Sequence, residues 1–135
     1  MENNTVKIKR RHAGSTIAEG LPGESLKALV ARCAREGVSL HTADLCGVDL
    51  CGVNLSNAHL VYADLSSGRL SGANLSGADL SGAILCYTDF SNAKLEDVAG
   101  LYNAVCPDEG AFIAYKAVKP NVILKLEILE SSRRL

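Results

Sequence analysis

The sequence predicts an all-β solenoid built from square coils, and three regularities lead to this fold class. A leucine or phenylalanine stands at every fifth position from Leu40 to Leu95, with a small residue two positions before it in nearly every repeat. The two residues after it are often turn formers such as Ser-Gly or Ser-Asn. A helix would rotate this stripe by about 140° per repeat, and a strand would turn every second leucine outward. The chain must therefore turn a corner in every repeat.

The N-terminal unit, residues 1–37, is expected to be a β-hairpin followed by a capping α-helix. Apolar and basic residues alternate between Thr5 and His12, and Gly14 offers a turn before a second short strand, Thr16 to Glu19. Ser25 can then cap a helix that ends at Gly37. The apolar stripe of this helix would cover the first coil, whose leucines and strand edges are otherwise exposed.

The second unit, residues 38–98, is the repeat array. Four corners bring the chain round in twenty residues with every leucine inside, and stacked coils then hydrogen-bond at a spacing of about 4.8 Å. The array allows about three coils, which is roughly the minimum for a stable solenoid. Small residues accompany the leucines because four leucines already fill most of a layer. The expected core residues are Leu45, Leu50, Leu55, Leu60, Leu65, Leu70, Leu75, Leu80, Leu85 and Phe90.

Three segments of the array carry a specific resemblance. Ala63 to Ser66 reads Ala-Asp-Leu-Ser, Ala73 to Gly77 reads Ala-Asn-Leu-Ser-Gly, and Ala78 to Gly82 reads Ala-Asp-Leu-Ser-Gly. They resemble the pentapeptide-repeat family of right-handed quadrilateral β-helices over residues 38 to 98. The resemblance implies a right-handed quadrilateral β-helix but little about function, because a fold does not determine a function.

The third unit, residues 99–135, is expected to form a C-terminal β-hairpin from two strands, 111–118 and 122–129, around a Lys-Pro-Asn turn. Together the three units resemble phage and bacterial pentapeptide-repeat proteins that carry an extra C-terminal domain. An isolated hairpin is marginal in water, so this one should cover the last coil, pair with another copy in a homodimer, or be the truncated start of a longer domain. The expected oligomer interface contains Phe112, Tyr115, Leu124, Leu126 and Ile128.

Composition and charge indicate the cellular compartment of the protein and limit the kinds of partner that can be expected. The formal net charge is −1, the array holds seven acidic and two basic residues, and the first 37 residues hold seven basic and four acidic ones. No apolar run is long enough to span a bilayer, and the N-terminus lacks the apolar core of a signal peptide. Five cysteines without a C-x-x-C pair indicate reduced structural thiols. We expect a cytoplasmic protein without a membrane association.

Function is predicted only at the level of class. No nucleophile elbow, phosphate-binding loop or zinc spacing is present, so the sequence predicts no enzyme, no catalytic, cofactor-binding or metal-binding residues, and no cofactor. We expect a structural or protein-interaction scaffold with an unknown protein partner.

Two alternatives stay open. The resemblance allows a DNA-mimic regulator of a topoisomerase such as gyrase, although about 14 Å of mildly acidic array is short for such a mimic. The basic run from Lys7 to Arg11 allows a nucleic-acid contact, but no aromatic residue interrupts it, so nucleic acid is the less favoured partner.

Overall fold

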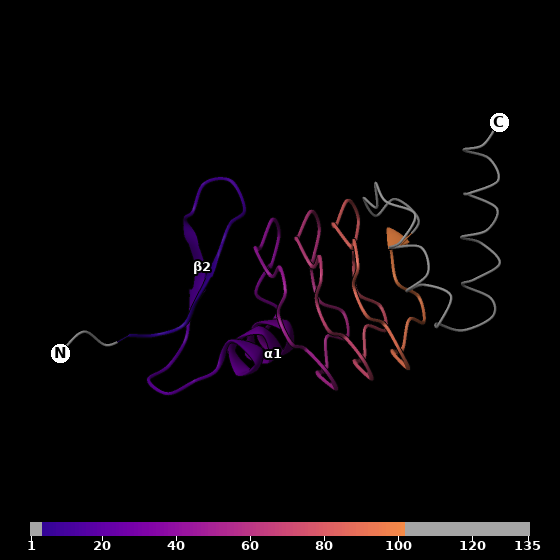
Figure 1. Cartoon of the computed structure of the whole chain (residues 1–135), viewed down its shortest axis with the longest axis horizontal. Helices are drawn as coiled ribbons and strands as arrows, with labels where there is room; N and C mark the ends of the chain where they lie inside the picture. The colour runs from indigo at the N-terminus through magenta and orange to yellow at the C-terminus, as the bar shows by residue number, and fades with distance from the viewer. Residues whose placement is uncertain (1–3, 102–135) are drawn as a thin grey trace.

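The computed structural model describes residues 4–101, which contain an N-terminal hairpin, one helix and the repeat array. The elements that carry labels are β1 (Lys7–Lys9), β2 (Thr16–Glu19) and α1 (Leu26–Glu36). Figure 1 shows the hairpin and α1 at the N-terminal end, followed by coils stacked along the long axis of the molecule. The expected C-terminal hairpin and its interface residues lie outside the described range. Within that range, no helix is long and apolar enough to cross a membrane.

The hairpin pairs β1 with β2 in antiparallel register, as the alternation of apolar and basic residues predicts. Ile8 lies opposite Ala18 and is buried, whereas the flanking lysines are exposed. The register shifts after Ile8, and both Ile17 and Ala18 pack against the core as a result.

The other edge of the hairpin is also paired, which the sequence did not predict. The chain after β1 forms an antiparallel bridge from Arg10 to Ala43 of the first coil. Two backbone hydrogen bonds hold it there, from the Arg11 N–H to the Thr42 carbonyl and from the Asp44 N–H to the Lys9 carbonyl. The hairpin therefore extends the first coil, and backbone groups that the coil would otherwise expose are satisfied.

Helix α1 begins and ends where its capping residues predict. The Ser25 hydroxyl accepts a hydrogen bond from the Ala28 N–H at 3.1 Å, and Gly37 terminates the helix in the left-handed conformation. Leu29, Val30 and Cys33 form its buried stripe and belong to the same core as the coil leucines.

A two-pronged ion pair anchors α1 to the loop before it. The Arg32 guanidinium donates to both carboxylate oxygens of Glu24 at 3.0 Å, and a third donor reaches the Glu19 carbonyl of β2. This geometry joins three segments, the loop, β2 and α1, through one planar group. The ion pair holds the pKa of Glu24 below its ordinary value, with help from a hydrogen bond from the Leu21 N–H.

The repeat array consists of short parallel bridges between residues twenty positions apart. Four such ladders are present, one on each side of the coil, and they begin at Asp44, Asp49, Asn54 and His59. Each bridge is held by backbone hydrogen bonds between successive coils, for example from the Leu45 N–H to the Asp64 carbonyl and from the Asp64 N–H to the Ala43 carbonyl. A period of twenty with four ladders is the square coil expected from the five-residue repeat.

Burial follows the same pattern. The predicted core residues, from Leu45 to Phe90 at every fifth position, are all 0% exposed. The small residues two positions earlier are mostly buried as well, whereas the residue between them points outward. The core therefore runs through the middle of the coils from the hairpin to Leu101.

Every corner requires a left-handed residue. The second corner position has positive φ throughout the array, and glycine occupies it at five of these positions, for example Gly72 with φ 69°. Asn57 and Asn92 occupy it with φ 58°, consistent with the tolerance of asparagine for this conformation. Two tyrosines, Tyr62 and Tyr87, adopt it as well, with φ 57° and 59°.

One interior column departs from the rule of one small aliphatic residue per layer. Thr88 is fully buried, and its hydroxyl donates to the Leu65 carbonyl of the coil above at 2.8 Å. Gly68 lies in the coil of Leu65, in the same column as Thr88, and a Cβ there would be 2.8 Å from that same carbonyl oxygen. The absence of a side chain at Gly68 thus leaves the carbonyl accessible, so the buried hydroxyl is satisfied.

Candidate interaction surface

The outward residues of the four ladders form the surface of the array. Stacking at fixed spacing places them in columns, with one residue from each coil. The columns are Asp44, Asp64 and Ile84; Asp49, Arg69 and Asp89; Asn54, Asn74 and Lys94; and His59, Asp79 and Ala99. A partner would therefore meet a rigid grid of side chains rather than a flexible loop.

Most polar residues in these columns cap the corner that follows them. In each case the side-chain oxygen accepts a hydrogen bond from the backbone N–H two residues on, as Asp64 does from Ser66 at 2.9 Å and Asn74 from Ser76 at 3.0 Å. The same contact is made by Asp44, Asp49, Asn54, Asp79 and Asp89. These groups form Asx turns, so their first role is to shape the corners.

Capping also changes the acidity of the carboxyl groups. Hydrogen bonds from the hydroxyl and the backbone of Ser81 lower the pKa of Asp79 below its ordinary value, and Ser91 does the same for Asp89. For Asp49, the hydrogen bond from the Cys51 N–H is the largest cause of a lowered pKa, and Arg69 adds a smaller electrostatic contribution. These carboxylates are stabilised in their charged form, which suits capping rather than proton transfer.

The second column contains an ion-pair ladder. Arg69 lies between Asp49 and Asp89 in successive coils, and its guanidinium is 3.4 Å from the Asp49 carboxylate. Its charge also contributes to the lowered pKa of Asp89. Both side chains of the Arg69–Asp49 pair are more than half exposed, so the pair is solvent-screened. The acidic column is thus interrupted by a cation at its centre.

The corner formed by residues 41–42, 61–62 and 81–82, which we call the His41 corner, is contacted by side chains of the N-terminal hairpin. The Arg10 side chain donates to the His41 carbonyl at 3.1 Å and to the Thr42 hydroxyl at 3.2 Å. The Arg11 side chain donates to the Tyr62 carbonyl at 3.0 Å. The N-terminal hairpin therefore brings two arginines to this corner of the array.

Aromatic rings occupy the same corner. The His41 and Tyr62 rings meet edge to face, with centroids 5.8 Å apart and planes at 85°. The Tyr62 ring extends over the next coil, because a Cβ at Gly82 would be only 2.3 Å from Tyr62 Cε1. The side chain of Tyr62 is nevertheless 55% exposed. Gly82 and His41 hold the ring in place while leaving much of it open to solvent.

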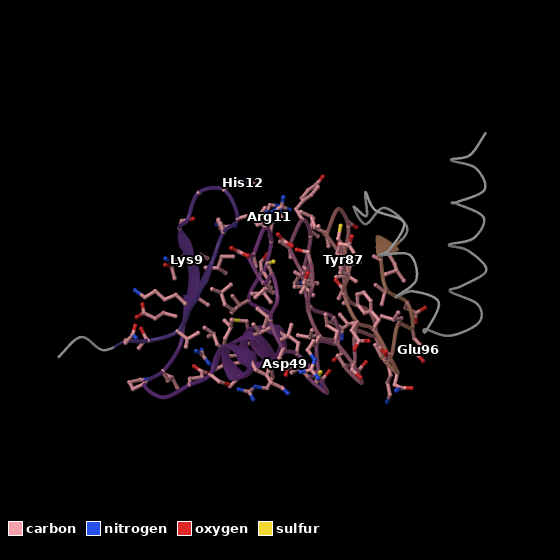
Figure 2. All side chains as sticks on the ribbon, viewed as in Figure 1. Lys9, Arg11, His12, Asp49, Tyr87 and Glu96 are labelled. Atoms are coloured by element: carbon pink, nitrogen blue, oxygen red, sulfur yellow. The ribbon has the colours of Figure 1, made fainter. Side chains whose placement is uncertain are left out.

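The histidines, which look scattered in the sequence, lie around this corner. His12 is on the hairpin tip with its Nε2 3.4 Å from an Arg11 nitrogen, and His59 occupies the column that leads into the corner. Figure 2 shows Arg11 and His12 on the opposite side of the molecule from Asp49 and Glu96. This grouping could not be predicted from the sequence, because the contacts join residues up to 51 positions apart.

No disulfide bond joins the cysteines of the described range, which are Cys33, Cys46, Cys51 and Cys86. Burial raises the pKa of Cys33, and the hydrogen bond to the Asp49 carboxylate raises that of Cys51. Cys46 lies one coil from Ser66, whose hydroxyl donates to its sulfur at 3.4 Å. Between residues 4 and 101, no cluster of three or more His, Cys, Asp or Glu side chains could hold a metal ion.

Ladders and corners of this kind define a β-helix solenoid. In a comparison with known protein families, residues 36–72 and 69–98 match Pentapeptide repeats in eight copies. The repeat array is therefore similar to the pentapeptide-repeat family, and this similarity implies a right-handed β-helix solenoid. A comparison with curated proteins gives no significant match.

The solved structures that are similar to the chain include two pentapeptide-repeat proteins. One is the pentapeptide-repeat protein Rfr23 from the cyanobacterium Cyanothece 51142, with 30% identity over 50% of this chain and 60% of that one, at a TM-score of 0.40. The other is HetL from Nostoc sp. strain PCC 7120, a pentapeptide-repeat protein involved in heterocyst differentiation regulation. It shows 31% identity over 48% of this chain and 41% of its own length, at a TM-score of 0.23. The chain thus spans less than two thirds of either structure.

Proposed function

We propose that the protein is a non-enzymatic scaffold that binds another protein through one face of its array. The observation that carries this proposal is the grid of outward side chains at fixed spacing, backed by a core without exposed leucines. Pentapeptide-repeat proteins are generally interaction scaffolds, which supports the same class. The capped carboxylates add support, because each already serves the fold and its charged form is stabilised.

The proposal predicts that binding is confined to one face. A photo-crosslinking amino acid would replace one outward residue on each side of the coil: Asp64, Arg69, Asn74 or Asp79. Each variant would be irradiated in cells and the crosslinked proteins identified. We expect one protein to be captured from one face, or from two faces that share a corner. Equal capture from all four faces, or capture from none, would contradict the proposal.

The DNA-mimic alternative has less support. A mimic needs a long and uninterrupted negative surface. Here Arg69 interrupts the column of Asp49 and Asp89, and the Asn54 column carries Lys94 instead of an acid. A gyrase supercoiling assay tests this alternative directly, and inhibition by the purified protein that is lost on reversing the charge of Asp89 would favour it.

A further inference from the structure

Tyr62 occupies a corner position at which a bulky residue is costly. Its φ is 57°, in the left-handed region that glycine and asparagine adopt most readily. Every corner of the array has a residue in this conformation, and Tyr87 adopts it with φ 59°, so the conformation itself belongs to the fold. Burial of apolar surface does not offset the energetic cost of this conformation, since Tyr62 is 55% exposed. The corner itself needs no tyrosine, because Asn57 and Asn92 fill the same position elsewhere in the array.

The ring is also prepositioned for contact with a flat ligand. The Gly82 backbone lies under its edge, where a side chain would collide with it, and His41 supports it edge to face. An aromatic ring that is fixed before binding loses little conformational entropy when a ligand stacks on it.

Two arginines reach the corner that carries this ring. Arg10 and Arg11 reach the corner from the hairpin and spend only some of their five donors on the contacts with the first two coils. Lys9, which comes just before these arginines in the chain, and His12, which follows them, are exposed.

Most carboxylates of the array lie beside corners other than the His41 corner. The columns through Asp44 and Asp49 place carboxylates beside the next two corners, whereas the column that leads into the His41 corner begins with Ser39 and His59 and reaches an acid only at Asp79. Ser39 pairs with the backbone N–H of His41 in the way that an aspartate does at other corners. In its first two coils this corner has no carboxylate from that column, whereas Asp79 caps Ser81 in the third coil, over which the Tyr62 ring extends.

We propose that the His41 corner binds single-stranded nucleic acid, with one base stacked on Tyr62 and the neighbouring phosphates held by Arg10 and Arg11. Aromatic rings beside cationic side chains are the usual means of binding single strands without sequence preference. The basic run in the sequence lacked an aromatic partner, and the fold supplies one from the second coil. This binding is separate from the protein-scaffold role and is independent of it.

The chain offers a matched control for the ring. Tyr87 has the same corner conformation, with φ 59°, and is 56% exposed. Its corner is the one that follows the Asp44 and Asp64 carboxylates, and the hairpin arginines make their contacts at the other corner. Tyr62→Asn and Tyr87→Asn therefore remove the same ring from a basic and from an acidic surrounding, and both introduce a residue that the corners accept.

The test is fluorescence anisotropy with a labelled oligouridine of about a dozen nucleotides in about 50 mM salt. We expect the full chain to bind it, Tyr62→Asn to weaken binding at least about tenfold, and Tyr87→Asn to change it less than about threefold. Arg11→Ala should weaken binding and flatten its salt dependence, whereas Arg11→Lys should restore the salt dependence. Circular dichroism of each variant separates loss of binding from loss of fold.

Four results would overturn the proposal. They are no detectable binding at about 200 μM protein in low salt, equal losses for the two tyrosine variants, tighter binding of a duplex of the same length, and equal binding of a polyglutamate peptide. The last result would indicate an acidic protein segment as the occupant of the His41 corner.

Discussion

Two residues of the interior show how local sequence can mislead. Gly68 and Thr88 look like defects in the repeat, since one lacks a side chain and the other carries a hydroxyl into the core. Stacking explains both, because the hydroxyl of Thr88 reaches the Leu65 carbonyl beside which Gly68 has no side chain. The five-residue pattern predicts that these positions face inward. It cannot predict the compensation, which depends on which coil lies above.

The ion-pair ladder gives a prediction at the same scale. We expect Arg69→Ala to lower the melting temperature by less than about 3 °C, because its ion pair with Asp49 is exposed and solvent-screened. Thermal denaturation followed by circular dichroism measures this shift. A loss of about 8 °C or more would show that the ladder is a structural element in its own right.

The corner caps predict how stability depends on pH. The pKa values of Asp79 and Asp89 are lower in the folded chain than their ordinary value of 3.8, chiefly because serine hydroxyl and N–H groups donate to the carboxylates. Their stabilising contribution is therefore complete above about pH 5 and is lost as the pH falls through the folded pKa values. We expect the free energy of unfolding to decrease on acidification below about pH 4.

Substitution by asparagine tests this assignment without removing the cap. Asn54 and Asn74 make the same contact with an uncharged oxygen, so Asp79→Asn combined with Asp89→Asn should keep the corners and reduce the loss of stability in acid. Asn74→Asp should have the opposite effect. Urea denaturation at pH 7 and at about pH 2.5 measures both. An unchanged acid sensitivity in the double variant would assign the effect to other groups.

The elements at the N-terminal end were predictable to different degrees. The bounds of α1 follow from Ser25 and Gly37, because capping is a local property of the sequence. The strands of the hairpin follow from alternation. The shift after Ile8 and the bridge from Arg10 to Ala43 do not, since register and long-range pairing depend on the surface that the hairpin meets. The His41 corner is built by that pairing, so it was hidden for the same reason.

The square coil predicts a sharp contrast between inward and outward substitutions. Leu70→Ala and Leu75→Ala should each cost about 2–5 kcal/mol, because these side chains are fully buried and the hydrogen-bonded coil cannot collapse onto the cavity. Asn74→Ala should cost less than about 1 kcal/mol, the typical value of one partly exposed hydrogen bond. Urea denaturation of the three variants measures the difference. Similar losses inside and outside would contradict the assignment of the core.

At the scale of the whole molecule, the four-sided array and its hairpin extension explain why the fold was more predictable than the surface. Inward positions are constrained by packing in every coil, so the pattern repeats and can be recognised. Outward positions need only cap a corner or remain polar, and Ile84, Arg69 and His59 are all accepted there. What distinguishes one face from another is therefore set by a few unrepeated residues, and only their three-dimensional grouping shows it.

Association of the whole chain is the last prediction, and it rests on the sequence outside the described residues. The segment 111–129 is rich in apolar residues in both of its expected strands, among them Phe112, Tyr115, Leu124, Leu126 and Ile128. Two apolar strands with open edges gain stability by pairing with a second copy. We expect a homodimer, because such pairing would cover these side chains in both chains at once. Sedimentation equilibrium of the full chain should give a dimer mass, whereas a version ending at Cys106 should give a monomer mass. A full chain that stays monomeric at high concentration would exclude this interface, and a dimer that persists in the shortened chain would place the contact on the array.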